Sequence, residues 1–249
     1  MSAILNERVS SAPSTMPGVT RVAIREVREA AFRAFVATGA SNAEAKVASE
    51  QVLFTELHRG SGLVALLQEL AAGPWARAGL ACRRDDSREQ PVLRVTGPGR
   101  PGALRQGALL VDLLTAEAER DTVVVSDGLH SLSPLFDEPL IRAARAADCW
   151  VVAADRSASS LSFRVASPDG AIGAGEVTST GHRQPDRPDV PPGVSLVRRE
   201  LRPEWDITWL TAAEQWSTRA AAAQHGLLVD AGVWAEVKTA AEAYLVPEQ

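Results

Sequence analysis

The apolar positions near the start of the chain follow a helical spacing. They recur on one side of the expected helix, at Val22, Val27, Ala30, Phe35 and Val36. Such a stripe has to be buried against another element, so the pattern predicts an amphipathic helix rather than a strand. The helix is expected to end at Gly39, because glycine readily adopts the conformation that closes a helix.

Two more helices are predicted directly after the first. Ser41 and Glu44 form the S-x-x-E pattern of a capping box, which indicates a helix through residues 42–59. The leucine-rich run 62–73 follows and stops at Pro74. Proline lacks the amide donor and forces the preceding residue out of the helical region, so the third helix has to end there.

Short apolar runs then alternate with helical patterns. The runs 91–96, 122–127 and 150–155 have the composition of strands, and helical patterns over 103–119 and 137–149 separate them. Strand–helix–strand at this spacing predicts a βαβ unit. We expect "TVVVSD" and "WVVAAD" to be neighbouring parallel strands of one sheet.

The last third of the chain contains strands, a turn and two helices. Residues 161–167 and 194–201 read as strands, and the glycine-rich run 169–176 reads as a hairpin turn. Helical patterns close the chain at 212–226 and 231–246.

These elements predict an α/β fold, with an N-terminal helical block, a mixed sheet with a βαβ unit, and C-terminal helices. The expected parts are a flexible N-terminus at 1–20, the helical block at 21–75, the α/β core at 76–200, and helices packing on the helical block at 201–249.

Composition narrows the classes of partner. The 26 basic and 31 acidic residues are interspersed and give a formal net charge of -5, so nucleic acid and anionic membranes are disfavoured. No signal-peptide pattern or membrane-spanning apolar run is visible. Cys82 and Cys149 are far apart and have no metal-ligand spacing, which disfavours a disulfide framework or a zinc site. We expect a cytoplasmic protein that binds no metal.

Two features of the α/β core could bind a ligand. Gly99, Arg100 and Gly102 precede a predicted helix, whose N-terminus and backbone amides could cradle an anionic cofactor; a plain tight turn is the alternative. His130 follows a predicted strand, so it is expected at the edge of the sheet where ligand crevices form. It could act as an acid or base, or it could be an ordinary surface histidine.

A second group of candidates lies at a helix junction. His58 and Arg59 end the second predicted helix, and Gly60 and Ser61 follow. An arginine there could hold a substrate carboxylate with two hydrogen bonds, and the imidazole could exchange a proton. The alternative is a helix C-terminus stabilised by cations.

Residues 22–62, "VAIREVREAAFRAFVATGASNAEAKVASEQVLFTELHRGSG", resemble the opening of the malate/L-lactate dehydrogenase family that lacks a Rossmann fold. In that family two helices lead to an Arg-Gly-His-x-Ser-His-Gly motif. The segment "RPGALRQGALLVDLLTAEAERDTVVVSDGLHS" resembles the family's glycine-rich turn, helix, strand and histidine-containing loop. The runs "GLVALLQEL" and "TAAEAYLVPE" are similar to a short bacterial offshoot of the family.

The resemblance implies reduction of a small 2-oxo acid or cyclic imine with NAD(P)H. It places Arg59 and Gly60 at the substrate carboxylate and His130 beside the nicotinamide. The sequence departs from the family where "SGLV" replaces the paired histidines, so the family's proton donor has no counterpart unless His58 substitutes.

Three hypotheses therefore stay open. The first is a reduced-size oxidoreductase, and the second is an enzyme that acts on a small carboxylate without a cofactor. The third is a non-catalytic subunit of a homodimer or hetero-oligomer, whose late tryptophan-bearing helices form the interface.

Overall fold

The structure is a computed structural model in which part of the chain is described. The described residues are 18–75, 81–87, 91–96, 102–117, 122–126, 129, 132–156, 160–178, 193–199 and 206–245. Residues 1–17 of the predicted flexible N-terminus lie outside these ranges, and strand β1 (Val19–Val22) begins before the predicted boundary at residue 20.

The three predicted N-terminal helices are confirmed. They are α1 (Ile24–Ala37), α2 (Asn42–Arg59) and α3 (Gly62–Ala71). Ser41 and Glu44 form the predicted capping box. The Glu44 amide donates to Ser41 Oγ at 3.3 Å, and the Ser41 amide donates to Glu44 Oε2 at 2.8 Å. Gly39 follows α1 with a φ of 97°, which is a conformation that glycine adopts at little cost.

Eight described strands between residues 81 and 210 form one mixed sheet, which confirms the predicted α/β class. They are β2 (Ala81–Asp85), β3 (Val92–Thr96), β4 (Val123–Ser126), β5 (Trp150–Arg156), β6 (Ser160–Ala166), β7 (Ile172–Thr178), β8 (Gly193–Arg199) and β9 (Thr208–Leu210). Their order across the sheet is β2-β3-β4-β8-β5-β6-β7-β9. β6 and β7 form a hairpin, but its turn is shorter than predicted. Residues 172–176, which were read as part of the turn, belong to β7, and Ile172 pairs with Ala166 of β6.

The expectation that "TVVVSD" and "WVVAAD" are neighbours is wrong. β8 lies between β4 and β5 and pairs antiparallel with both, so those two strands run parallel to each other without touching. The parallel neighbours are β3 and β4, which α4 (Ala103–Ala116) connects as a βαβ unit. Local periodicity identifies a strand but carries no information on a distant strand inserted between two predicted neighbours.

The apolar strands are buried on both faces of the sheet. On β4, Val124 belongs to the core between the sheet and the helices, whereas Val123 and Val125 belong to a smaller apolar cluster on the opposite face. Residues on a strand alternate between the two faces, so burial of both produces a continuous apolar run.

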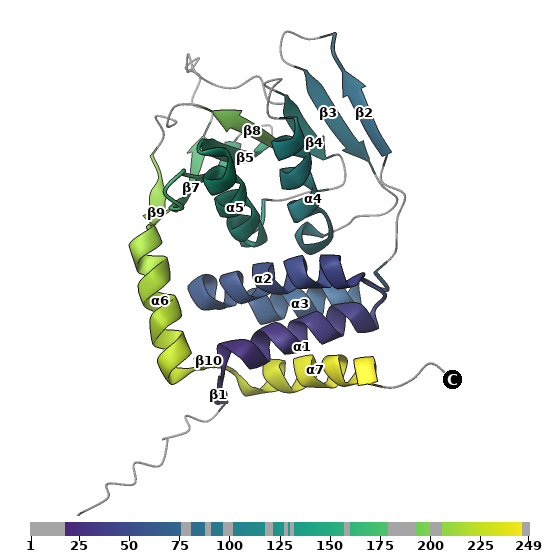
Figure 1. Ribbon diagram of the computed structural model, residues 1–249, viewed down its shortest axis with the longest axis vertical. Coiled ribbons are helices and arrows are strands. Elements are labelled where there is room, and N and C mark those ends of the chain that lie inside the picture. The colour runs from purple at the N-terminus through teal and green to yellow at the C-terminus, as the bar shows by residue number, and fades with distance from the viewer. Residues whose placement is uncertain are drawn as a thin grey trace, which may run out of the picture.

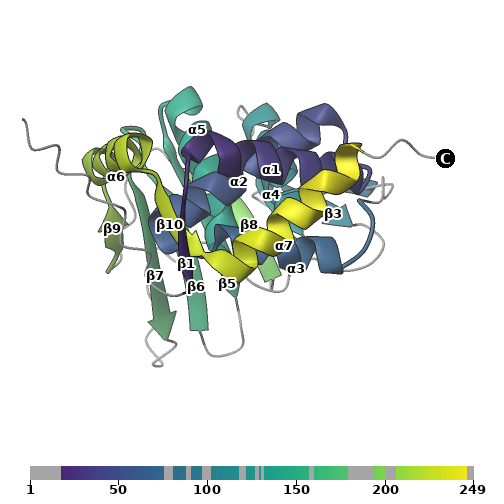
Figure 2. The same ribbon diagram turned by 90° about the horizontal axis from the view of Figure 1, so that it is seen from below.

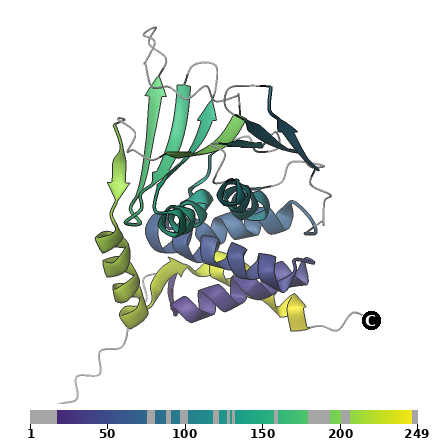
Figure 3. The ribbon, with the colours of Figure 1, turned by 45° about the horizontal axis from the view of Figure 1, so that its top comes forward.

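Helices form successive layers on one face of the sheet (Figures 1 and 3). α4 and α5 (Asp137–Ala147) lie against the sheet, α2 and α3 lie beyond them, and α1 follows with α7 (Ala231–Glu242). Viewed from below, α7 crosses under α1 and α3 (Figure 2). β1 pairs with β10 (Leu227–Asp230) in a separate two-stranded sheet, which joins the start of the described chain to the segment between α6 and α7.

α6 (Ala212–His225) lies at the edge of the molecule, beside the end of α2 (Figure 1). Gln215 and Ala222 are its buried residues. Among the described residues, no helix is long and apolar enough to cross a membrane.

Candidate functional site

The backbone at the helix junction explains why residues 60 and 62 are glycines. Gly60 closes α2 in the left-handed conformation, with a φ of 63°. Gly62 lies directly on α2, where an added Cβ would overlap the Val52 carbonyl oxygen and approach the Glu56 backbone. Only a residue without a side chain allows α3 to start this close to α2. Ser61 precedes α3, and its side chain makes no capping hydrogen bond.

Arg59 points to a buried carboxylate. Its Nη2 lies 3.3 Å from Asp137 Oδ2, and Arg164 Nη1 donates to Asp137 Oδ1 at 2.6 Å. Burial raises the pKa of Asp137, and the two guanidinium groups oppose that shift by favouring the carboxylate. Two cations and one anion leave this cluster with one positive charge. The cluster connects α2, the start of α5 and β6.

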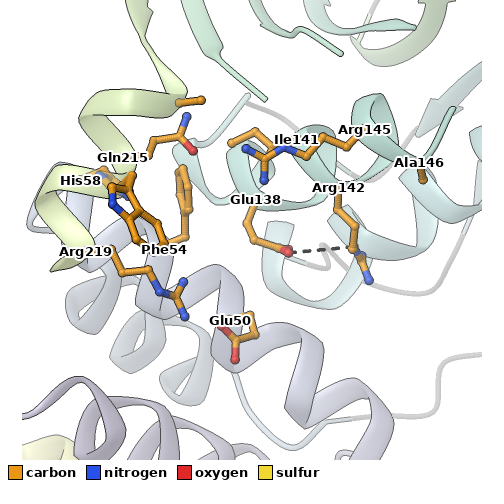
Figure 4. Close-up of a pocket in the computed structure, with 12 residues that line it drawn as sticks. Glu50, Phe54, His58, Glu138, Ile141, Arg142, Arg145, Ala146, Gln215 and Arg219 are labelled. Carbon is orange, nitrogen blue, oxygen red and sulfur yellow. Dashed lines mark ion pairs between the residues drawn. The ribbon is translucent and has the colours of Figure 1, made fainter. Parts of the chain in front are cut away.

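A pocket of about 610 Å³ lies between α2, α5 and α6. Its lining residues include Glu50, Phe54 and His58 from α2, Glu138, Ile141, Arg142, Arg145 and Ala146 from α5, and Ala212, Gln215, Trp216 and Arg219 from α6. Figure 4 shows these side chains converging from the three helices. Positions 50, 54 and 58 repeat every four residues, so they share one face of α2.

His58 is the sequence-predicted residue that lines this pocket. Its ring lies against Phe54, with a centroid separation of 4.4 Å. Burial, with smaller contributions from the charges of Arg59 and Arg219, lowers the pKa of His58 to about 4. The imidazole is therefore neutral at physiological pH, and it can accept a proton or donate one hydrogen bond.

The pocket contains more cationic than anionic side chains. The lining includes three arginines and two glutamates, namely Arg142, Arg145, Arg219, Glu50 and Glu138. One group of each sign already has a partner outside the pocket. Arg28 Nε lies 2.6 Å from Glu50 Oε1, and Arg142 Nη2 lies 3.8 Å from Asp112 Oδ1. The charged side chains that remain have a net positive charge, which favours an anionic ligand.

Arg145 and Arg219 differ in how they are held. Arg145 lies over Gly170, where an added Cβ would overlap its guanidinium group, so the hairpin turn between β6 and β7 fixes its position. Arg219 comes from α6 and has no ion pair with any residue that the structure describes. Its guanidinium group is directed toward the α2 side of the pocket (Figure 4).

The predicted cofactor segment is described only in part. Gly99 and Arg100 lie outside the described residues, as does His130. Gly102 precedes α4, and an added Cβ there would overlap the carboxylate of Glu69. Glu69 is buried and is paired with Arg105. The described part of the α4 N-terminus, at Gly102, therefore contacts the Glu69–Arg105 ion pair.

Several pocket residues were not singled out from the sequence. Glu138, Arg142 and Arg145 lie on one face of α5, at the spacing of successive helical turns. A polar stripe on a predicted helix was the available signal, although solvated helix faces commonly look the same. Arg219 gave no signal, because its role depends on where α6 lies relative to α2. In the described part of the chain, no cluster of histidine, cysteine and carboxylate side chains could hold a metal ion.

Solved dehydrogenase structures have a similar fold. Malate dehydrogenase from Entamoeba histolytica has a TM-score of 0.62 and 9% identity, over 92% of this chain and 99% of that chain. Malate dehydrogenase from Pyrococcus horikoshii has a TM-score of 0.61 and 10% identity, over 96% and 99%. A dehydrogenase from Sinorhizobium meliloti has a TM-score of 0.56 and 13% identity, over 90% and 99%.

No protein-family model and no curated protein matches the chain. At these identities the structural likeness concerns the fold, and one fold can carry many activities. The chain is therefore similar in fold to these dehydrogenases.

Proposed function

We propose that this protein is a malate/lactate-dehydrogenase-like enzyme that acts on a small carboxylate in the α2–α5–α6 pocket. The observation that carries the proposal is the neutral imidazole of His58 in the same pocket as the Arg219 guanidinium. A guanidinium group can hold a carboxylate, and a neutral imidazole can exchange a proton with an adjacent ligand oxygen.

The pocket also has a size suited to a small organic acid. Its volume of about 610 Å³ falls within the range of small-molecule sites, and Phe54 and Ile141 provide apolar surface beside the charged groups. Arg59 stays a candidate for the substrate carboxylate because its cluster with Asp137 and Arg164 keeps one positive charge.

Two reactions are compatible with such a site. The first is NAD(P)H-dependent reduction of a small 2-oxo acid or cyclic imine, and the shared fold with dehydrogenases favours it. The second is chemistry on a carboxylate without a cofactor, which the Glu69 carboxylate beside Gly102 favours. A nicotinamide would supply a hydride in the first reaction. The residues of this chain would bind the carboxylate and provide the proton.

Titration calorimetry with pyruvate tests the carboxylate site. We expect pyruvate to bind the wild-type protein and Arg219→Met to weaken binding about tenfold or more, because a charge-assisted hydrogen bond contributes about 1.5–3 kcal/mol. Arg25→Met is the matched control, since Arg25 lies on α1 with its side chain 83% exposed. Equal pyruvate affinity in both variants would exclude the pocket as the carboxylate site.

Separate titrations with NADH and NADPH distinguish the two reactions. Micromolar binding of either would support the oxidoreductase and justify a search among 2-oxo acids and imines. Absence of binding at millimolar cofactor, with pyruvate binding retained, would support the cofactor-free enzyme.

A further inference from the structure

We propose that Glu138 is the proton-carrying residue of the α2–α5–α6 pocket: its carboxylate takes up a proton when a ligand binds and presents that proton to an oxygen of the ligand. This inference rests on the proposed function, because it assigns a second chemical group to the same site. It identifies a proton donor in a chain that lacks the paired histidines of the family it resembles.

The position of Glu138 suits this role. It is the second residue of α5, and its carboxyl group points into the pocket between Phe54 and Arg142 (Figure 4). The side chain is 24% exposed, so a ligand in the pocket can reach it. Its Oε2 is nevertheless buried and has no hydrogen-bond partner among the described residues. Buried polar atoms normally have partners, so rotation of the carboxyl group toward a ligand oxygen in the pocket would give Oε2 the hydrogen bond that it lacks.

Only one cation approaches the Glu138 carboxyl group among the described ion pairs. Arg142 Nε lies 3.9 Å from Glu138 Oε1, which is too long for a hydrogen bond. Arg142 is also shared with Asp112 of α4, at 3.8 Å. The cation therefore favours the carboxylate form of Glu138 only weakly.

The other charged groups around Glu138 come from the helices packed against α5. Glu50 of α2 and Asp112 of α4 are acidic and disfavour a second negative charge. Glu50 is partly neutralised by Arg28 of α1. Burial is the largest influence, and together with these carboxylates it raises the pKa of Glu138.

The basic groups across the pocket belong to α2 and α6. His58 is neutral, so it adds no charge that would favour ionisation of Glu138. Arg219 and Arg145 line the pocket without an ion pair to Glu138. A bound carboxylate would occupy these cations and add a negative charge, which would favour protonated Glu138 further.

The proton transfer is balanced within the pocket. The ligand oxygen that accepts the proton is one on which negative charge develops in the reaction. The O–H bond of the Glu138 carboxyl group breaks, an O–H bond forms on that oxygen, and the negative charge passes from the ligand oxygen to Glu138. Arg142 can then close its 3.9 Å separation and stabilise the new carboxylate. Solvent supplies the next proton to Glu138 when another ligand binds.

Titration of Glu138 in the free protein tests the proposal without a ligand. Carbon-13 NMR of glutamate-labelled protein, with Glu138→Gln to assign the resonance, should give a pKa above the ordinary value of about 4.3. A pKa at or below that value would overturn the proposal. This measurement stays decisive even if pyruvate does not bind, a result that would count against the proposed function instead.

Proton uptake on pyruvate binding tests the role in the pocket. Calorimetry near neutral pH in phosphate and in Tris, whose ionisation enthalpies differ, gives the number of protons taken up per pyruvate bound. We expect uptake in the wild type, its loss in Glu138→Gln, and its retention in His58→Gln. Glu236→Gln, on the exposed side of α7, is the control for removal of a carboxylate. Uptake that persists in Glu138→Gln, or disappears in His58→Gln alone, would overturn the assignment.

Discussion

The Arg59 guanidinium lies 3.3 Å from the buried Asp137 carboxylate, so the residue expected to bind a substrate also holds the start of α5 against α2. Asp137 is fully buried, whereas Arg59 is 34% exposed and Arg164 is 12% exposed. The cluster therefore has a structural role whether or not Arg59 also binds a ligand.

Removal of the Asp137 carboxylate should be strongly destabilising. Asp137→Ala would leave Arg164 and Arg59 without their buried anion, and breaking a buried ion pair costs about 3–5 kcal/mol. Urea denaturation measures the free energy of unfolding. The control is Asp112→Ala, at a carboxylate that is 66% exposed, where we expect a loss below about 1 kcal/mol. Similar losses in both variants would show that the Asp137 cluster contributes little.

The two glycines of the junction should respond differently to substitution. Gly60→Ala places a Cβ in the left-handed conformation and should cost about 1 kcal/mol, because open space surrounds that position. Gly62→Ala introduces an overlap with the α2 backbone and should cost about 3 kcal/mol. Denaturant unfolding of the two variants compares these values directly. An equal cost would contradict the close approach of α3 to α2.

His58 should make the protein less stable in mild acid. Its pKa is about 4 in the folded state, against an ordinary value of about 6.5. Between these values the unfolded state binds more protons, so the stability contribution of His58 is complete above about pH 6.5 and is lost as pH falls toward 4. The measurement is the difference in unfolding free energy between wild type and His58→Gln across this range.

The wild type has to be compared with His58→Gln because Glu138 changes the unfolding free energy with pH in the opposite direction to His58. The pKa of Glu138 is raised, so its contribution to folding is lost as pH rises through its folded value. A wild-type minus His58→Gln difference that is independent of pH would show that His58 has an ordinary pKa.

We also propose that the protein forms a homodimer through its α6 side. Trp216 on α6 is 74% exposed and Leu228 on β10 is 63% exposed, and aromatic side chains such as Trp216 are enriched at protein interfaces. Light scattering after size exclusion should give a dimer for the wild type and a larger monomer fraction for Trp216→Ser. Val64→Ser, at an exposed residue on α3, should leave the mass unchanged. A monomeric wild type would rule out this dimer.

The helical block was predictable because its signals are local. The capping box of Ser41 and Glu44 and the stop at Pro74 depend on neighbours within a few residues, and the structure has α1, α2 and α3 in the predicted places. The position of β8 was not predictable. It joins the sheet between β4 and β5 although some forty residues separate it from β5 in sequence, and strand pairing over such separations depends on the whole fold.

The candidate site also combines features that the sequence predicted with features that only the fold decides. From the sequence, His58 and Arg59 were candidates because an imidazole and a guanidinium at a helix end can bind and protonate an anion. Adjacent residues on a helix point in directions about 100° apart, so only the tertiary structure could place His58 in the pocket and Arg59 on Asp137.

Sequence alone determined the helices, the more apolar strands and the α/β class, because capping, chain breaks and hydrophobic alternation act over a few residues. The short strands β1, β2, β9 and β10 were not predicted. The tertiary structure decided which charged groups meet. Glu138 and Arg219 are 81 residues apart in the chain, and they line one pocket because α5 and α6 both lie beside α2. Burial and neighbouring charge then set the properties of each side chain, and those depend on the packed molecule rather than on local sequence.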